Sequence, residues 1–89
     1  MITQQVTIVN RLGLHARAAA KFVQTAAAFK CEISVAKAGN KVNGKSIMGL
    51  MMLAASQGTT LDLATSGENE EGAMRALATL IAERFGESE

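Results

Sequence analysis

Apolar and polar residues alternate in four short segments of the chain, and this two-residue period is the pattern of half-buried β-strands. The four segments run over Ile2–Val9, Glu32–Lys37, Lys41–Asn43 and Thr59–Thr65. Ala38-Gly39-Asn40, between the second and third segments, suits a tight turn because glycine adopts the positive φ that hairpin turns require. The sequence therefore predicts four strands, of which the second and third form a hairpin.

Other segments carry apolar residues at helical spacing, where positions i, i+3, i+4 and i+7 share one face. The first helix is predicted to begin at Ala16 and to run for about three turns, with a buried face of Ala19, Phe22, Val23 and Ala26. The second is predicted over Ile47–Gln57, between an N-cap at Ser46 and a terminating Gly58. Its buried side comprises Leu50, Leu53 and Ala54.

A third helix is predicted after Asn69, which is a suitable N-cap. Glu70 and Glu71 fall in its first turn, where the helix dipole favours negative charge. Its predicted buried stripe consists of Met74, Leu77, Ala78, Ile81 and Phe85. The last residues, Gly86 to Glu89, continue no pattern and are expected to be frayed.

The order strand, helix, strand, strand, helix, strand, helix predicts an α+β fold (βαββαβα), with helices on one face of a single sheet. The chain has 89 residues and no linker-like segment, so one domain is expected over residues 1–89.

The amino-acid composition argues against several classes of function. Nine Lys and Arg against eight Asp and Glu leave a net charge of +1, without the basic excess of nucleic-acid-binding proteins. No apolar run approaches the roughly 18–20 residues that span a bilayer, so we expect no membrane insertion and a cytoplasmic location. The one cysteine, Cys31, can form neither an internal disulfide nor a multi-cysteine metal site. No metal and no cofactor are expected.

The only histidine, His15, stands at the predicted start of the first helix, after Gly13, which lets the chain bend. A helix N-terminus exposes unpaired backbone N–H groups, here those of Ala16 and Arg17, and attracts anions, phosphate above all. The guanidinium of Arg17 adds donors suited to phosphate oxygens. His15 could thus accept a phosphoryl group, although a lone histidine before a helix is more often a surface residue or a cap.

Two motifs, Asn10–Ala19 and Asn43–Met51, resemble the HPr family of histidine-containing phosphocarrier proteins of the bacterial phosphoenolpyruvate-dependent phosphotransferase system. The similarity extends over essentially the whole chain. It implies that His15 Nδ1 takes a phosphoryl group from phosphorylated enzyme I and passes it to a histidine of an enzyme II A protein. It also implies that Arg17 supports the transfer and that the protein is a covalent carrier rather than an enzyme.

The resemblance further implies that Ser46 is a regulatory phosphorylation site for HPr kinase/phosphorylase. It places Ile47, Met48 and Met51 on the face that docks enzyme I and the II A domains, whereas Met52 could equally fill the core. The protein is expected to be a monomer. One departure is Ala18, where many relatives have proline.

The family fold is an open-faced β-sandwich whose antiparallel sheet has the order 1-4-2-3. Two alternatives remain open. A regulatory branch of the system, nitrogen-related or carbon-catabolite, would act mainly by binding target proteins. A small ligand-binding domain with a ferredoxin-like βαββαβ core would instead have the sheet order 4-1-3-2.

Overall fold

The structure, a computed structural model, describes all residues from 1 to 89. Its elements are β1 (Ile2–Thr7), α1 (Ala16–Ala27), β2 (Glu32–Lys37), β3 (Asn40–Asn43), α2 (Ile47–Met52), β4 (Thr60–Ser66), α3 (Glu70–Ala82) and a 3-10 turn (Arg84–Gly86). The strand limits agree with the predicted ones to within two residues.

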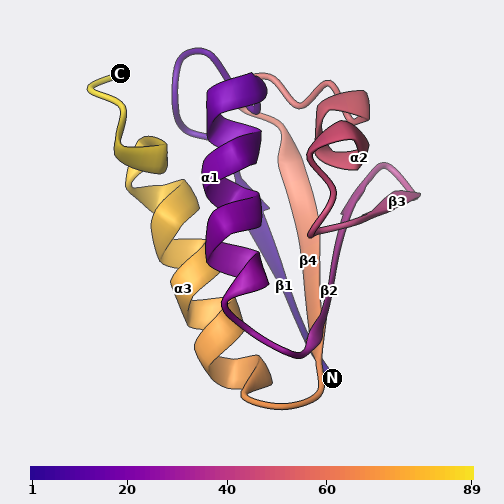
Figure 1. The fold of residues 1–89 in the computed structure, drawn as a ribbon. Coiled ribbons are helices and arrows are strands. Elements are labelled where there is room, and N and C mark those ends of the chain that lie inside the picture. Colours follow the sequence, from indigo (N-terminus) through magenta and orange to yellow (C-terminus); the bar gives the residue numbers. More distant parts are fainter.

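The four strands form one antiparallel sheet in the order β1-β4-β2-β3. All three helices lie on the same face of the sheet, with α1 and α3 side by side and α2 next to β3 (Figure 1). The α+β prediction and the order 1-4-2-3 are therefore confirmed. This order excludes the ferredoxin-like arrangement.

The core fills the space between the sheet and the helices. Alternate strand residues point into it, among them Ile33 and Val35 of β2 and Leu61 and Leu63 of β4. The helices contribute Phe22, Leu50, Leu77 and Ile81. Because a strand turns successive side chains to opposite faces, the intervening residues Glu32 and Asp62 are exposed.

The second helix is shorter than predicted, because α2 already ends at Met52. Leu53 is its C-cap, and Ala54 has a left-handed φ of 51°. Lys37 Nζ donates to the carbonyl oxygens of Leu53 at 2.9 Å and Ala54 at 3.2 Å. These acceptors are satisfied by a side chain from β2 instead of by further helical turns, and Ala54 is exposed rather than buried.

Gly58 terminates no helix. It has a φ of 91°, and its N–H donates to the carbonyl of Ile8 at 2.8 Å. The glycine therefore serves the turn that leads the chain into β4.

The third helix also ends before its predicted limit. Met74, Leu77 and Ile81 are buried as predicted, and Ala78 is partly buried. Phe85 is fully buried, but it lies in the 3-10 turn with a φ of 54° and not on the helix.

Asn69 occupies the N-cap position of α3, as predicted, but its side chain makes no capping hydrogen bond. At the start of α3, the side chain that makes polar contacts is that of Glu70. Its Oε1 accepts the N–H of Gly67 at 2.9 Å and its Oε2 lies 3.2 Å from the amino group of Met1. The hydrogen bond from Gly67 and the terminal ammonium hold the pKa of Glu70 below its usual value.

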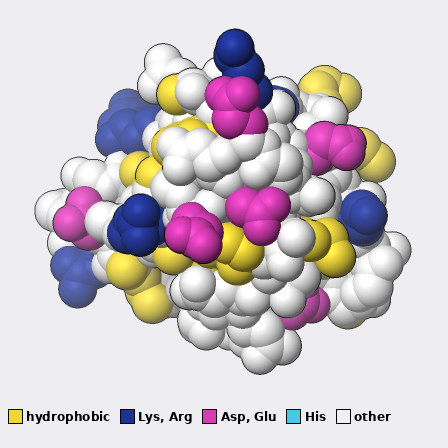
Figure 2. Space-filling model, turned by 90° about the horizontal axis from the view of Figure 1, so that it is seen from below, with side chains coloured by type: hydrophobic (Ala, Val, Ile, Leu, Met, Phe, Trp, Pro, Cys, Tyr) yellow, Lys and Arg dark blue, Asp and Glu magenta, His cyan; other side chains and the backbone are white.

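None of the helices has the length and apolar character needed to cross a membrane. The end of the molecule that carries the N-terminus displays acidic and basic side chains interspersed, and no histidine is visible there (Figure 2). The start of α1 lies at the other end of the molecule (Figure 1).

We expect Gly13→Ala to lower the free energy of unfolding more than Gly39→Ala. Both glycines have positive φ, 69° and 88°, so both substitutions strain the backbone. A Cβ at Gly13 would also meet the carbonyl oxygen of Ala55 at 2.5 Å, whereas one at Gly39 would meet nothing within 4 Å. Overpacking of this kind costs about 1–3 kcal/mol, which urea denaturation of the two variants would measure. Equal losses would contradict this account of the turn.

Candidate functional site

His15 is the N-cap residue of α1, placed by a tight turn after β1. Gly13 forms the turn with its positive φ, and the N–H of Leu14 donates to the carbonyl of Ala55 at 2.8 Å. The buried Leu14 fixes the turn against the core. The imidazole is left 29% exposed, so it is held by the fold yet open to a partner.

The N-terminus of α1 has free donors. The first helical bond runs from the N–H of Ala19 to the carbonyl of His15, and the N–H groups of Ala16, Arg17 and Ala18 have no backbone partner. His15 makes no side-chain capping bond, and the first turn contains no acidic residue. The helix dipole is therefore not neutralised by the chain's own side chains, and the geometry suits an anion.

Three cationic side chains line the same pocket as His15. Arg11 pairs with Glu89 at 3.1 Å, and Lys21 Nζ donates to the carbonyl of Phe85 at 2.7 Å. Arg17 is exposed and takes part in no side-chain hydrogen bond or salt bridge of the structure. Arg17 is thus the pocket cation whose donors are available to a ligand.

The C-terminal tail is ordered over this pocket, and the expectation of a frayed end is wrong. Glu87 Oε2 is hydrogen-bonded to His15 Nε2, and Glu87 Oε1 accepts from Asn10 Nδ2 at 3.0 Å. The backbone N–H of Arg11 also donates to the carbonyl of Glu89. These contacts join residues that are more than seventy positions apart in the sequence.

Two opposing effects act on the pKa of Glu87. Burial raises it, because the carboxylate loses solvation. Hydrogen bonds from His15 and Asn10, together with the charges of His15 and Lys21, lower it by more. The net result is a lowered pKa, so Glu87 faces His15 as a carboxylate at neutral pH.

Sequence reasoning missed Glu87 and Asn10. Asn10 is fully buried; its Nδ2 also donates to the carbonyl of Gly13 at 2.8 Å, while its Oδ1 has no hydrogen-bond partner. The signal in the sequence that could have indicated these contacts is Phe85. A large aromatic side chain tends to be buried, and its burial would hold the neighbouring tail residues against the fold.

The other residues of the predicted site lie on α2 and at its N-cap. Ser46 is the N-cap of α2, and its Oγ accepts the N–H of Gly49 at 3.0 Å, as predicted for a cap. A group of exposed apolar side chains follows, here named the α2 face: Ile47, Met48, Met51 and Met52. Met52 is 79% exposed, so the idea that it fills the core is wrong.

The α2 face and His15 belong to neighbouring parts of the molecule. The helices α1 and α2 are in contact. A shallow pocket is lined by His15 and Leu12 on one side and by the segment that follows α2, Ala54, Ala55 and Ser56, on the other. Leu12 is 67% exposed and adds apolar surface beside His15.

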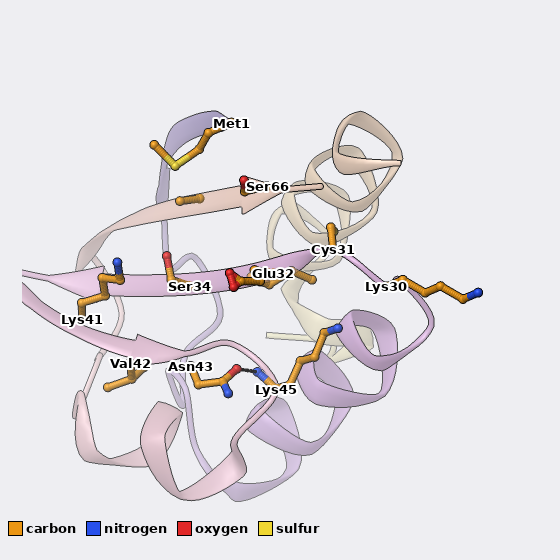
Figure 3. Close-up of a pocket in the computed structure, with 12 residues that line it drawn as sticks. Met1, Lys30, Cys31, Glu32, Ser34, Lys41, Val42, Asn43, Lys45 and Ser66 are labelled. Carbon is orange, nitrogen blue, oxygen red and sulfur yellow. Dashed lines mark hydrogen bonds between the residues drawn. The ribbon is translucent and has the colours of Figure 1, made fainter. Parts of the chain in front are cut away.

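Another pocket lies over β2, β3 and β4, away from His15 (Figure 3). Its labelled side chains point in different directions, and the hydrogen bond drawn among them joins Asn43 Oδ1 to the N–H of Lys45 at 2.8 Å. Cys31 on its rim is buried and unpaired. No group of three His, Cys, Asp or Glu residues is placed to bind a metal ion anywhere in the chain.

Comparison with known proteins gives consistent matches. A family model described as the PTS HPr component phosphorylation site matches residues 2–83. The phosphocarrier protein HPr of Neisseria meningitidis serogroup A is 58% identical over 89 residues, all of both chains. The solved HPr-C-His from Thermoanaerobacter tengcongensis aligns over 100% of each chain at 49% identity, with a TM-score of 0.96. An HPr dimer from the same organism matches at 50% identity and a TM-score of 0.78, over 98% of this chain and 100% of that one.

The contribution of Glu87 to stability should depend on pH. Since folding lowers its pKa from an ordinary value of 4.5, the contribution should be complete above pH 4.5 and lost as the pH falls through the lower folded-state value. We expect the difference in unfolding free energy between the wild type and Glu87→Gln to be constant near pH 6 and to shrink towards about pH 3.

Glu83→Gln is the matched control, because Glu83 is exposed and belongs to no salt bridge. Chemical denaturation at several pH values measures both differences. If the Glu87→Gln difference does not change with pH, the tie between the tail carboxylate and His15 is not ionic.

Proposed function

This chain belongs to the HPr family of phosphocarrier proteins of the phosphotransferase system, and we propose that His15 is the residue that carries the phosphoryl group. The main support is that the only imidazole of the chain stands at a helix N-terminus with free N–H donors. It shares its pocket with the unpaired guanidinium of Arg17.

The reaction is a transfer between two histidines. The lone pair of His15 Nδ1 attacks the phosphorus of a phosphohistidine on enzyme I, which carries a group that originates in phosphoenolpyruvate. A new N–P bond forms, the old one breaks, and its electron pair returns to the donor nitrogen. Attack by a histidine of an enzyme II A protein reverses these roles, so the chain is a carrier that turns over only with partners.

The groups around His15 suit the negative charge of the phosphoryl group that is transferred. The equatorial phosphoryl oxygens carry negative charge throughout the transfer, and positioning with electrostatic stabilisation provides most of the catalysis in such reactions. The N–H groups of Ala16 and Arg17 and the guanidinium of Arg17 would hold these oxygens. No cofactor is required, because the partner supplies the group already activated.

The α2 face is the proposed docking surface for enzyme I and the II A proteins, through Ile47, Met48 and Met51. Their exposed fractions are 42%, 75% and 46%, which is high for apolar side chains. Methionine adapts its shape to different surfaces, and this property suits a protein that meets donor and acceptors in turn. We place the protein in the cytoplasm as a monomer, where these partners would have access to it.

Ser46 is the proposed regulatory site, modified by HPr kinase/phosphorylase. Ser46 is a partly exposed residue and directly precedes Ile47 of the α2 face. A phosphate adds about −1.5 to −2 charges, which would disturb apolar docking beside it. The N-terminus of α2 would tolerate this charge within the protein.

Incubation with phosphoenolpyruvate and enzyme I should add one acid-labile phosphate to the wild type and none to His15→Ala, since the variant lacks the nucleophile. Intact-mass measurement and radiolabel counting would follow the reaction. A label that persists in His15→Ala would contradict the assignment. A wild type that takes the label but passes it to no II A protein would point to the regulatory alternative.

Two more variants, measured in the same assay, separate the role of Arg17 in transfer from the role of Met48 in docking. Arg17→Ala should slow transfer by about tenfold or more, because a hydrogen bond to a charged group contributes about 1.5–3 kcal/mol. Met48→Ser should raise the half-saturating concentration about tenfold with little change in the maximal rate, since only docking loses apolar burial. Wild-type kinetics in either variant would remove that residue from the proposal.

Treatment with ATP and HPr kinase/phosphorylase should modify Ser46 and slow the later phosphorylation of His15. Ser46→Ala should resist modification and lose about 1 kcal/mol of stability with the cap. Ser66→Ala is the matched control, because Ser66 is exposed, caps no helix and lies outside the pockets that contain His15. A label that survives in Ser46→Ala, or unchanged kinetics of His15 after modification, would rule out the regulatory role.

A further inference from the structure

We propose that Glu87 is a positioning residue for His15, holding the imidazole with its proton on Nε2 so that Nδ1 presents a free lone pair. This inference rests on the proposed function of His15 as the phosphoryl acceptor. It concerns a residue of the C-terminal tail, outside both motifs that carry the family resemblance.

Both oxygens of the Glu87 carboxylate are engaged. Oε2 is bonded to His15 Nε2, and Oε1 accepts from Nδ2 of Asn10. Asn10 is itself fully buried and also donates to the carbonyl of Gly13, in the turn that precedes His15. The carboxylate is therefore aimed at the ring by the same turn that positions the ring, and its side chain is only 14% exposed.

The tail that carries Glu87 is fastened on each side. Before it, Phe85 is completely buried, and its carbonyl accepts from Lys21 Nζ of α1. After it, the carbonyl of Glu89 accepts the N–H of Arg11, and the Glu89 carboxylate pairs with the Arg11 guanidinium. Anchors on both sides distinguish this contact from that of a loose terminus.

The chemistry follows from the acceptor nature of a carboxylate. An ionised carboxylate only accepts hydrogen bonds, so the ring nitrogen that faces it carries the proton. The hydrogen bond at one ring nitrogen determines the role of the other, and Nδ1 makes no hydrogen bond within the chain. In the neutral imidazole, Nδ1 is then the nitrogen without a proton, and its lone pair is available for attack.

The proton balance of the transfer supports this role. When Nδ1 forms its bond to phosphorus, the ring keeps the Nε2 proton and becomes a phosphorylated imidazolium. Glu87 then faces a positive ring, which it stabilises as a carboxylate stabilises the imidazolium in other His–carboxylate pairs. When the group leaves for the acceptor, the electron pair returns to Nδ1, and no proton has to be moved.

The test compares Glu87→Ala and Glu87→Gln with Glu89→Ala, a change that removes a tie of the tail without touching His15. Hydrogen-bond partners of metal-binding histidines typically contribute 10- to 100-fold to affinity or activity, and we take the lower end of this range for the partner of His15. Glu87→Ala should therefore lower the maximal rate of phosphorylation by enzyme I about tenfold, with the half-saturating concentration unchanged. Glu87→Gln, which keeps an acceptor oxygen but no charge, should fall between it and the wild type.

Proton NMR adds a readout that a purely structural role would not move. The wild type and Glu89→Ala should show a strongly deshielded Nε2-bound proton of His15, and Glu87→Ala should lose it while remaining folded. Equal rate losses in Glu87→Ala and Glu89→Ala, or a wild-type rate in Glu87→Ala, would overturn the proposal. A wild type that takes no label on His15 would instead overturn the proposed function.

Discussion

The turn at Gly13 is the constraint on which the site depends. Its left-handed backbone and the hydrogen bond from Leu14 to Ala55 redirect the chain into α1 at the end of the eight-residue connection from β1. A side chain there has no room. If the chain turned more widely, the first N–H groups of α1 would point elsewhere, and the buried Asn10 would lose its acceptor at the Gly13 carbonyl.

The residues that stabilise the fold and the residues of the candidate site lie in different parts of the molecule. The core between the sheet and the helices is built from aliphatic and aromatic residues, and it needs no polar groups beyond Asn10 and Thr65. The polar chemistry is confined to one end of the molecule, where the start of α1 and the C-terminal tail come together (Figure 1). A phosphoryl group on His15, the proposed site, would therefore add its charge without disturbing the packing that holds the ring.

The sequence was sufficient for the order and type of the elements, because the two-residue and helical periods are local properties. The limits of α2 and α3 depend on distant partners that no local pattern contains. Lys37 reaches from β2 to the end of α2, and Phe85 is buried only because α1 and α3 leave a place for it. Within the site, the motif around His15 predicted the ring and Arg17, but the contact with Glu87 links positions 72 residues apart.

The position of the two termini has a practical consequence for handling the protein. The backbone of Glu89 is bonded to Arg11, at the rim of the pocket that contains His15. Any extra residues attached after Glu89 would begin at the pocket that also contains His15 and would compete with a docking partner for space. Met1 lies at the opposite end of the molecule (Figure 1), so an affinity tag or fluorophore attached there would leave the surface around His15 unobstructed.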